Sequence, residues 1–236
     1  MRILAIDATS MAGSVAVSEN NKLIGEYYIC NKLTHAETIM PLLEHMQKMI
    51  QIYEFDAVAV ASGPGSFTGI RIGVGTAKAL ALALDVPIVG VSTLEVLAYA
   101  MIGQEGLICP IMDARRNQAY SALYTFEGDT LVTLEQPKCI DVEDMINIIL
   151  KYNKKIIFVG DGIDVYKEQI LAKLEAVFAP SFLCMPRASV LAHIAYTKVI
   201  EGETSDVDSF APIYLRKPQA QRELEEREQN DDTQGN

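Results

Sequence analysis

Hydrophobic and polar residues follow a strand-like pattern near the start of the chain. Residues 2–8 form an apolar run that carries an acid, Asp7, close to its end, which is typical of a buried strand. Residues 14–18 and 23–29 then alternate between apolar and polar side chains, with Gly and Asn turn signals between the segments. This pattern predicts an antiparallel three-stranded meander.

A helix is predicted after the meander. Apolar residues between positions 35 and 52 recur at helical spacing, and Thr34 with Glu37 makes the pattern of a capping box at the start. The next predicted elements, in chain order, are a strand over 57–61, a helix over 69–84, a strand over 87–91 and a short helix after Ser92, where Glu95 makes a second capping-box pattern.

The second half of the chain repeats this order. Its predicted elements are strands over 107–113, 118–126 and 130–140, a helix over 141–150 that Asp141 caps, a strand over 155–159 and a helix over 163–174. Ile6-Asp7-Ala8 is similar to Met112-Asp113-Ala114, and the apolar strand before Gly63 is similar to the one before Gly160. The matched order and spacing predict an internal duplication of a β-β-β-α-β-α unit.

Two such units describe an α/β protein with the actin-like fold (ASKHA, ribonuclease H-like). In that fold the first strand of each half ends in an Asp that faces a central cleft. We expect an N-terminal half over residues 1–104 and a C-terminal half over residues 105–216, the latter with a further helix over 187–201. Residues 217–236 are polar and acidic, and we expect a partly disordered tail there with some helix over 219–229.

Composition is ordinary for a globular protein, but the charge is unbalanced. The 236 residues are 50% hydrophobic and 22% charged, so the chain can bury a core without disulfides. The net charge is −11, and the two bases and six acids of residues 222–236 leave −7 on the rest. Because so acidic a body is poorly suited to bind nucleic-acid phosphates, we expect any contact with nucleic acid to be made through a partner.

The remaining compositional signals indicate a cytoplasmic protein without membrane attachment. The first apolar run is too short for a signal peptide, and the apolar region 77–102 is broken by charged residues and a proline. The four cysteines have neither metal-binding nor redox spacing, so we expect small buried side chains in a reducing compartment.

Polar residues after the first strand suggest a phosphate site. In a phosphate-binding cleft Asp7 would hold a metal-bound water, and Thr9 and Ser10 would donate hydrogen bonds to a phosphate. Asp113, at the end of the matching strand, would face Asp7 across the cleft. Alternatively, the three polar side chains after the first strand cap backbone groups of a turn. Spacing alone favours neither interpretation.

The segment from Gly63 to Gly69 is the most informative part of the sequence. It reads Gly-Pro-Gly-Ser-Phe-Thr-Gly and predicts a tight turn into a helix that Ser66 or Thr68 caps, although it is not a Walker A motif. The helix after it places Gly69, Gly73, Ala77 and Ala81 on one face. Because Gly inside a helix costs roughly 1 kcal/mol relative to Ala, a closely packed neighbour is expected, either within the chain or on another subunit.

Two further positions have competing interpretations. His35 opens the first helix, but no second His lies three or four residues away, so the spacing argues against a metal site and favours a capping or interface role. Arg115 and Arg116 follow Asp113 and are expected either to bind an anion or to form a solvated turn.

Several segments resemble the TsaB (YeaZ) family. They are residues 3–7 and 14–17, His35 with Pro41-Leu42-Leu43, Gly63 through Gly73, Gly90 through Leu94, Asp113-Ala114-Arg115-Arg116, and Pro212 through Arg216. The similarity covers about residues 1–216, and the Gly63–Gly73 segment is highly specific.

The resemblance implies a bacterial protein of threonylcarbamoyladenosine synthesis at position 37 of tRNA. It implies the actin-like fold and a member that does not itself carry out the transfer. Its partner would be the related TsaD, which holds the catalytic metal in a His-x-x-x-His motif, and the ATPase TsaE would join the pair. Ile39 stands where the second His of that motif would be. ATP would be used by the complex, and no cofactor or metal is expected for the isolated chain.

The resemblance also implies a pairing surface on helices 35–52 and 69–84, used with TsaD or in a homodimer. The partner-binding residues that it implies are His35, Ile39, Leu42, Leu43, Met46, Gly69, Ile70, Gly73, Val74 and Ala77. The small residues of the second helix would then let helices from two subunits approach closely.

A second class of function remains open beside this one. An ATP-dependent phosphotransferase or ATPase of the same fold would use Asp7, Asp113 and the Gly160-Asp161-Gly162 loop to hold its nucleotide. ATP turnover by the isolated chain distinguishes the two classes. Glycoprotease, an old label for the family, has no support here, because the sequence shows neither a Ser-His-Asp order nor an HExxH motif.

Overall fold

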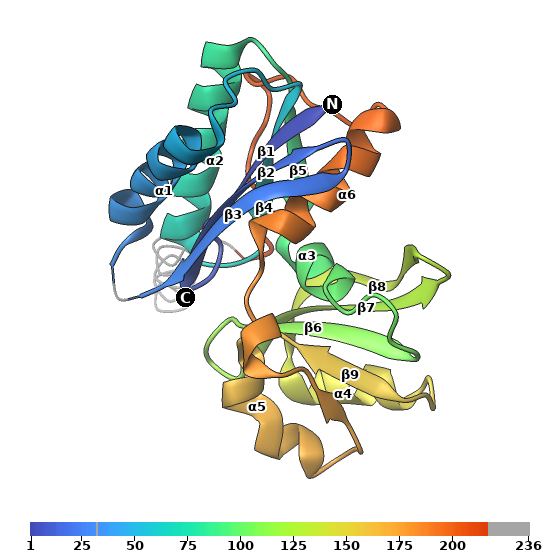
Figure 1. The fold of residues 1–236 in the computed structure, drawn as a ribbon. Helices are drawn as coiled ribbons and strands as arrows, with labels where there is room; N and C mark the ends of the chain where they lie inside the picture. The colour runs from blue at the N-terminus through green and yellow to red at the C-terminus, as the bar shows by residue number, and fades with distance from the viewer. Residues whose placement is uncertain (32, 217–236) are drawn as a thin grey trace, which may run out of the picture.

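Two mixed β-sheets with helices packed against them form the two halves of the molecule (Figure 1). The structure is a computed structural model, and it describes residues 1–31 and 33–216. The first half contains β1 (Arg2–Asp7), β2 (Ala12–Glu19), β3 (Lys22–Cys30), α1 (His35–Ile50), β4 (Ala57–Gly63), α2 (Phe67–Leu84), β5 (Ile88–Ser92) and α3 (Thr93–Tyr99). Its strands lie in the order β3-β2-β1-β4-β5.

The second half repeats this topology. It contains β6 (Leu107–Asp113), β7 (Gln118–Glu127), β8 (Thr130–Asp141), α4 (Val142–Leu150), β9 (Ile156–Val159), α5 (Gly162–Leu171), β10 (Val177–Phe178) and the 3-10 turn η1 (Ser181–Leu183). The strand order β8-β7-β6-β9-β10 matches that of the first sheet, with an antiparallel meander joined to parallel strands. The predicted α/β actin-like fold with two similar halves is therefore confirmed.

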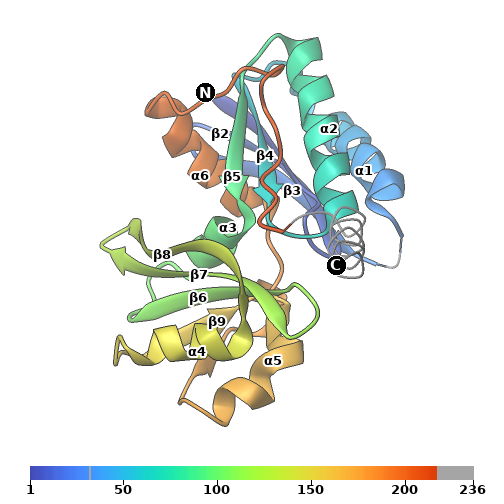
Figure 2. The same ribbon diagram turned by 180° about the vertical axis from the view of Figure 1, so that it is seen from behind.

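The central strands of the first sheet, β1, β2 and β4, are buried on both faces. Alternate residues of β1 point to opposite sides, so Leu4 and Ile6 pack under α1 and α2, whereas Ile3 and Ala5 pack under α6 (Ala188–Ile200). Figures 1 and 2 show α1 and α2 side by side on one face and α6 on the other. This three-layer arrangement explains why β1 and β4 are continuous apolar runs.

Helix α3 joins the two halves. Its residues Leu94 and Leu97 are fully buried against Ile108 and Met112 of β6, which belongs to the second sheet. The other face of that sheet is covered by α4 and α5. The short helix that the sequence predicts after Ser92 therefore forms the core between the halves.

The C-terminal region lies elsewhere than the sequence predicts. We expected residues 187–216 within the C-terminal half, but α6 packs on the first sheet and residues 205–213 continue along it, with Ser205 bridged to Ile88 of β5. The apolar residues of α6, including Leu191, find their partners on β1 and β5. The tail predicted over 217–236 lies outside the described residues.

The structure confirms the predicted helix caps at α1 and α2 but not the one at α3. At α1 the carboxylate of Glu37 accepts hydrogen bonds from the backbone N–H and the hydroxyl of Thr34, which confirms that capping box. At α3 the hydroxyl of Ser92 has no hydrogen-bond partner among the described residues, so the second capping box is not complete. At α2 the Ser66 hydroxyl accepts from the N–H of Gly69, as predicted.

Helix α2 is long and apolar enough to cross a membrane when judged by length and composition alone. In the structure one face of this helix packs on the first sheet, and its apolar character comes largely from small residues and core contacts. Packing on the sheet thus accounts for the apolar residues of one face, whereas Leu82 on another face is 70% exposed.

Candidate functional site

The loop after β1 is folded on itself. Asp7 Oδ1 accepts hydrogen bonds from the N–H and the hydroxyl of Thr9, each at 2.9 Å, and the Ser10 hydroxyl bonds the backbone of Ala12. Asp7, Thr9 and Ser10 are 0%, 1% and 5% exposed. These contacts match the interpretation in which the polar side chains cap a turn.

The glycine-rich loop before α2 seals this turn. The N–H of Ser66 donates to the carbonyl of Thr9 at 2.7 Å. A Cβ atom at Gly65 would collide with the same carbonyl, and a Cβ at Gly69 would collide with the carbonyl of Ala8. Only glycine permits so close an approach of the two backbone segments. The contacts at Asp7, Thr9 and Ser10 favour the capped turn, and a phosphate or nucleotide site there stays a prediction.

The environment of Asp7 also opposes a charged ligand site. Burial raises the pKa of Asp7 to about 6, while the hydrogen bonds from Thr9 and the nearby His35 act in the opposite direction. Asp7 Oδ2 is buried and has no partner within the described part of the chain. Because burial disfavours the charged form, this carboxyl is poorly placed to hold a metal–nucleotide complex.

His35 connects α1 to the sealed turn. Its Nε2 lies 2.8 Å from the carbonyl oxygen of Ser10 and, because a carbonyl only accepts, this nitrogen carries the proton. The Cδ2 edge of the ring lies where a side chain at Gly69 would extend. His35 thus acts in packing and anchoring. Over residues 1–31 and 33–216 no cluster of three or more metal-binding side chains occurs.

The small-residue face of α2 packs inside the chain. A Cβ at Gly73 would lie 3.3 Å from that of Ala8 and 3.9 Å from Val60, and Ala77 and Ala81 are fully buried on the same sheet. The neighbour that the glycines require is therefore the start of the loop after β1, at Ala8, together with β4, rather than another subunit. The predicted partner contacts that the structure buries are Ile39, Met46, Gly69, Ile70, Gly73, Val74 and Ala77.

Other residues of α1 and α2 face outward. Leu42, Leu43 and His35 from the predicted set are half-buried, while Met40, Met49 and Leu82 are 47%, 75% and 70% exposed. The exposed side of α2 also carries a second series of small residues at four-residue spacing, Gly75, Ala79 and Ala83. The sequence signal for this surface is the large apolar residues that lie off the buried face of each helix. The prediction missed it because it placed the partner contacts mostly on the buried faces.

Asp113 has a different environment from Asp7. It is exposed, its Oδ1 accepts from the hydroxyl of Tyr166 at 2.6 Å and from the N–H of Arg115, and its own N–H donates to Asp161. Burial, together with the charge of Asp113, raises the pKa of Asp161 to about 6. One carboxylate is buried and the other exposed, so Asp7 and Asp113 differ in environment, and their pairing across a cleft stays a prediction.

The turn after Asp113 is solvated. Residues 115–117 have positive φ angles of 61°, 57° and 59°, and the two arginines are exposed. Arg216 spans from the C-terminal segment to the carbonyl of Ala114 and so fixes the turn from the other half.

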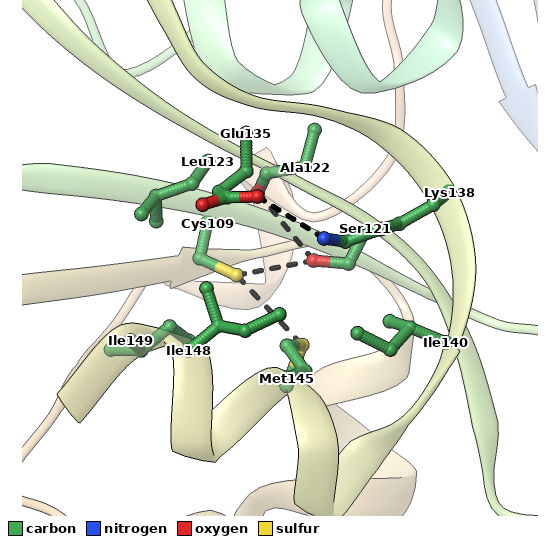
Figure 3. Close-up of a pocket in the computed structure, with 10 residues that line it drawn as sticks. All are labelled: Cys109, Ser121, Ala122, Leu123, Glu135, Lys138, Ile140, Met145, Ile148 and Ile149. Carbon is green, nitrogen blue, oxygen red and sulfur yellow. Dashed lines mark hydrogen bonds and ion pairs between the residues drawn. The ribbon is translucent and has the colours of Figure 1, made fainter. Parts of the chain in front are cut away.

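A small cavity lies under α4 in the second half (Figure 3). Its volume of about 20 Å³ has room for about one water molecule. The Sγ of Cys109 there lies 3.3 Å from the Ser121 hydroxyl and 4.0 Å from the Met145 sulfur, and burial raises the pKa of this thiol to about 12. Such a thiol is unreactive.

Cys30, in contrast, is exposed, so the expectation of buried cysteines is wrong for that residue.

Comparisons with known proteins agree with the resemblance. The family model described as "TsaD: tRNA N6-adenosine threonylcarbamoyltransferase" matches residues 30–224. A Bacillus subtilis protein named "tRNA threonylcarbamoyladenosine biosynthesis protein TsaB" is 32% identical over 94% of this chain and 96% of its own length. The Escherichia coli protein of the same name is 29% identical over 95% and 98%.

Solved structures show the same similarity. A Pseudomonas aeruginosa protein described as similar to peptidase YeaZ superposes with a TM-score of 0.81 at 26% identity. The alignment covers 91% of this chain and 99% of that structure.

Proposed function

Since this chain belongs to the TsaB family and so has a role in tRNA threonylcarbamoyladenosine biosynthesis, we propose that it acts as a non-catalytic subunit that binds and activates TsaD. The observation that carries this proposal is the sealed turn at Asp7. Close backbone contact between this turn and the glycine-rich segment favours a supporting role beside a related catalytic subunit.

The partner surface in this proposal is the outward side of α1 and α2, with Met40, Met49 and Leu82 as its exposed apolar residues. Gly75 and the small residues after it on α2 would let a partner helix approach closely, as Gly73 does toward the sheet. The same surface would form the homodimer when TsaD is absent. Burial of exposed apolar area is the expected source of affinity.

The remaining features of the proposal follow from charge and chemistry. With a net charge of −11 the chain would meet tRNA only through the complex, which TsaE joins. ATP would be used by the complex, and the isolated chain would need no cofactor. The cytoplasm is the expected compartment.

The test is native mass spectrometry of this chain mixed with TsaD, for the wild type and Gly75→Leu. Gly75 is exposed, and no described atom lies within 4 Å of the position of its missing Cβ, so a side chain there leaves the fold intact. We expect a one-to-one complex for the wild type and at least tenfold weaker association for Gly75→Leu. Ala172→Leu, at the exposed C-cap of α5, is the matched control and should bind normally.

Two results would contradict the proposal. If Gly75→Leu binds TsaD as well as the wild type, the outward side of α2 is not the partner surface. If the isolated chain hydrolyses ATP, the alternative of an actin-like ATPase or phosphotransferase is correct, and the sealed turn must open in solution.

A further inference from the structure

An apolar cavity of about 100 Å³ lies between α1, α2 and the first sheet. Leu4 of β1 and Val17 of β2 form part of its lining on the sheet side, and both are almost fully buried. Met46 from α1 and Leu80 from α2 line it on the helix side. It is separate from the sealed turn at Asp7 and from the cavity at Cys109, because it shares no lining residue with either.

The lining decides what such a cavity can hold. Nine of its residues are aliphatic, Met or Phe, and none of the described lining residues carries a charge. The two polar ones, Gln47 and Tyr53, are both exposed, so they lie toward solvent. At the sheet end a water molecule would find no polar side chain among the described lining residues. Apolar cavities of roughly 150 Å³ stay dry and take up benzene.

We propose that this cavity is a binding site for one small uncharged apolar molecule or group, about the size of a benzene ring. An apolar occupant would restore packing contacts that the lining atoms now lack. A charge placed at the sheet end would lose its hydration without gaining an ionic partner, so a charged group fits only where it reaches solvent. Gln47 and Tyr53 allow a polar substituent only at the solvent end. The proposal does not depend on the function assigned above.

The test is a titration of the full chain, with ¹³C-methyl-labelled methionines, with benzene. Met46 lines the apolar cavity, whereas the equally buried Met145 lines the cavity of about 20 Å³, which is too small for a ring. We expect the Met46 methyl signal to shift and saturate while the Met145 signal does not.

Filling the cavity from within provides the matched variant. Leu80→Phe adds volume at a half-buried lining position, and Leu84→Phe does so if the first variant fails to fold. In a variant that folds, the affinity for benzene, read from the Met46 methyl shift, should fall at least tenfold. Shifts that never saturate, that are equal at Met46 and Met145, or that persist in the filled variant would overturn the proposal.

Discussion

Replacing Asp7 with Asn should change how the stability of this protein depends on pH. Burial raises the pKa of Asp7 from 3.8 to about 6, so the folded state binds this proton more tightly than the unfolded state does. The stability contribution of the protonated group is therefore fully present below pH 3.8 and is lost as the pH rises through 6. At about 1.4 kcal/mol per pKa unit, the whole loss is about 3 kcal/mol, of which roughly half falls between pH 5 and pH 8.

Asn keeps most of the local geometry and removes the charge. Its side-chain oxygen can accept both hydrogen bonds from Thr9, while its amide replaces the Oδ2 atom that has no partner among the described residues. That amide costs a constant amount at every pH, because an unpaired buried donor is unfavourable. The informative quantity is therefore how the difference in unfolding free energy between variant and wild type changes with pH. The size of that difference at a single pH is not informative.

The assay is urea unfolding of both proteins at pH 5 and pH 8. We expect Asp7→Asn to gain roughly 1 to 2 kcal/mol relative to the wild type between these two pH values. Asp129→Asn, at an exposed turn, should show no such gain. Some pH dependence should persist in Asp7→Asn, because burial also raises the pKa of Asp161 to about 6. An unchanged difference at the two pH values would refute the reasoning and show that Asp7 reaches solvent.

Further predictions concern packing and thiol reactivity. Gly69→Ala should lower the free energy of unfolding by about 1 kcal/mol or more, because the new Cβ would meet the backbone of Ala8. Gly75→Ala in the same helix should raise it by about 1 kcal/mol, because no described atom lies near that Cβ. Denaturant titration of the two variants checks this, and equal effects would contradict it. Cys30 should react with iodoacetamide in the native protein while Cys109 reacts only on unfolding, as peptide mass mapping would show; native-state labelling of Cys109 would disprove its burial. Leu191→Ala should cost about 2–5 kcal/mol in thermal or urea unfolding, and a loss below about 1 kcal/mol would mean that α6 does not pack on the first sheet.

The sequence by itself determined the secondary structure and the duplicated fold. Strand periodicity, helical spacing and the Thr34–Glu37 capping box are local signals, because each depends on residues close together in the sequence. They predicted the order of the elements in each half. The specific Gly63–Gly73 segment identified the family. The short strand β10 was missed because two residues carry too little pattern to be recognised.

Only the tertiary structure decided which surfaces are free. Small residues repeat every four positions on both sides of α2, at Gly69 and Gly73 and again at Gly75 and Ala79, so periodicity alone does not distinguish the inward side from the outward one. The polar residues after β1 are equally suited to a phosphate and to a turn until the loop from Gly65 is laid over them. In each case the deciding quantity is the distance to a segment remote in sequence, and long-range packing sets that distance.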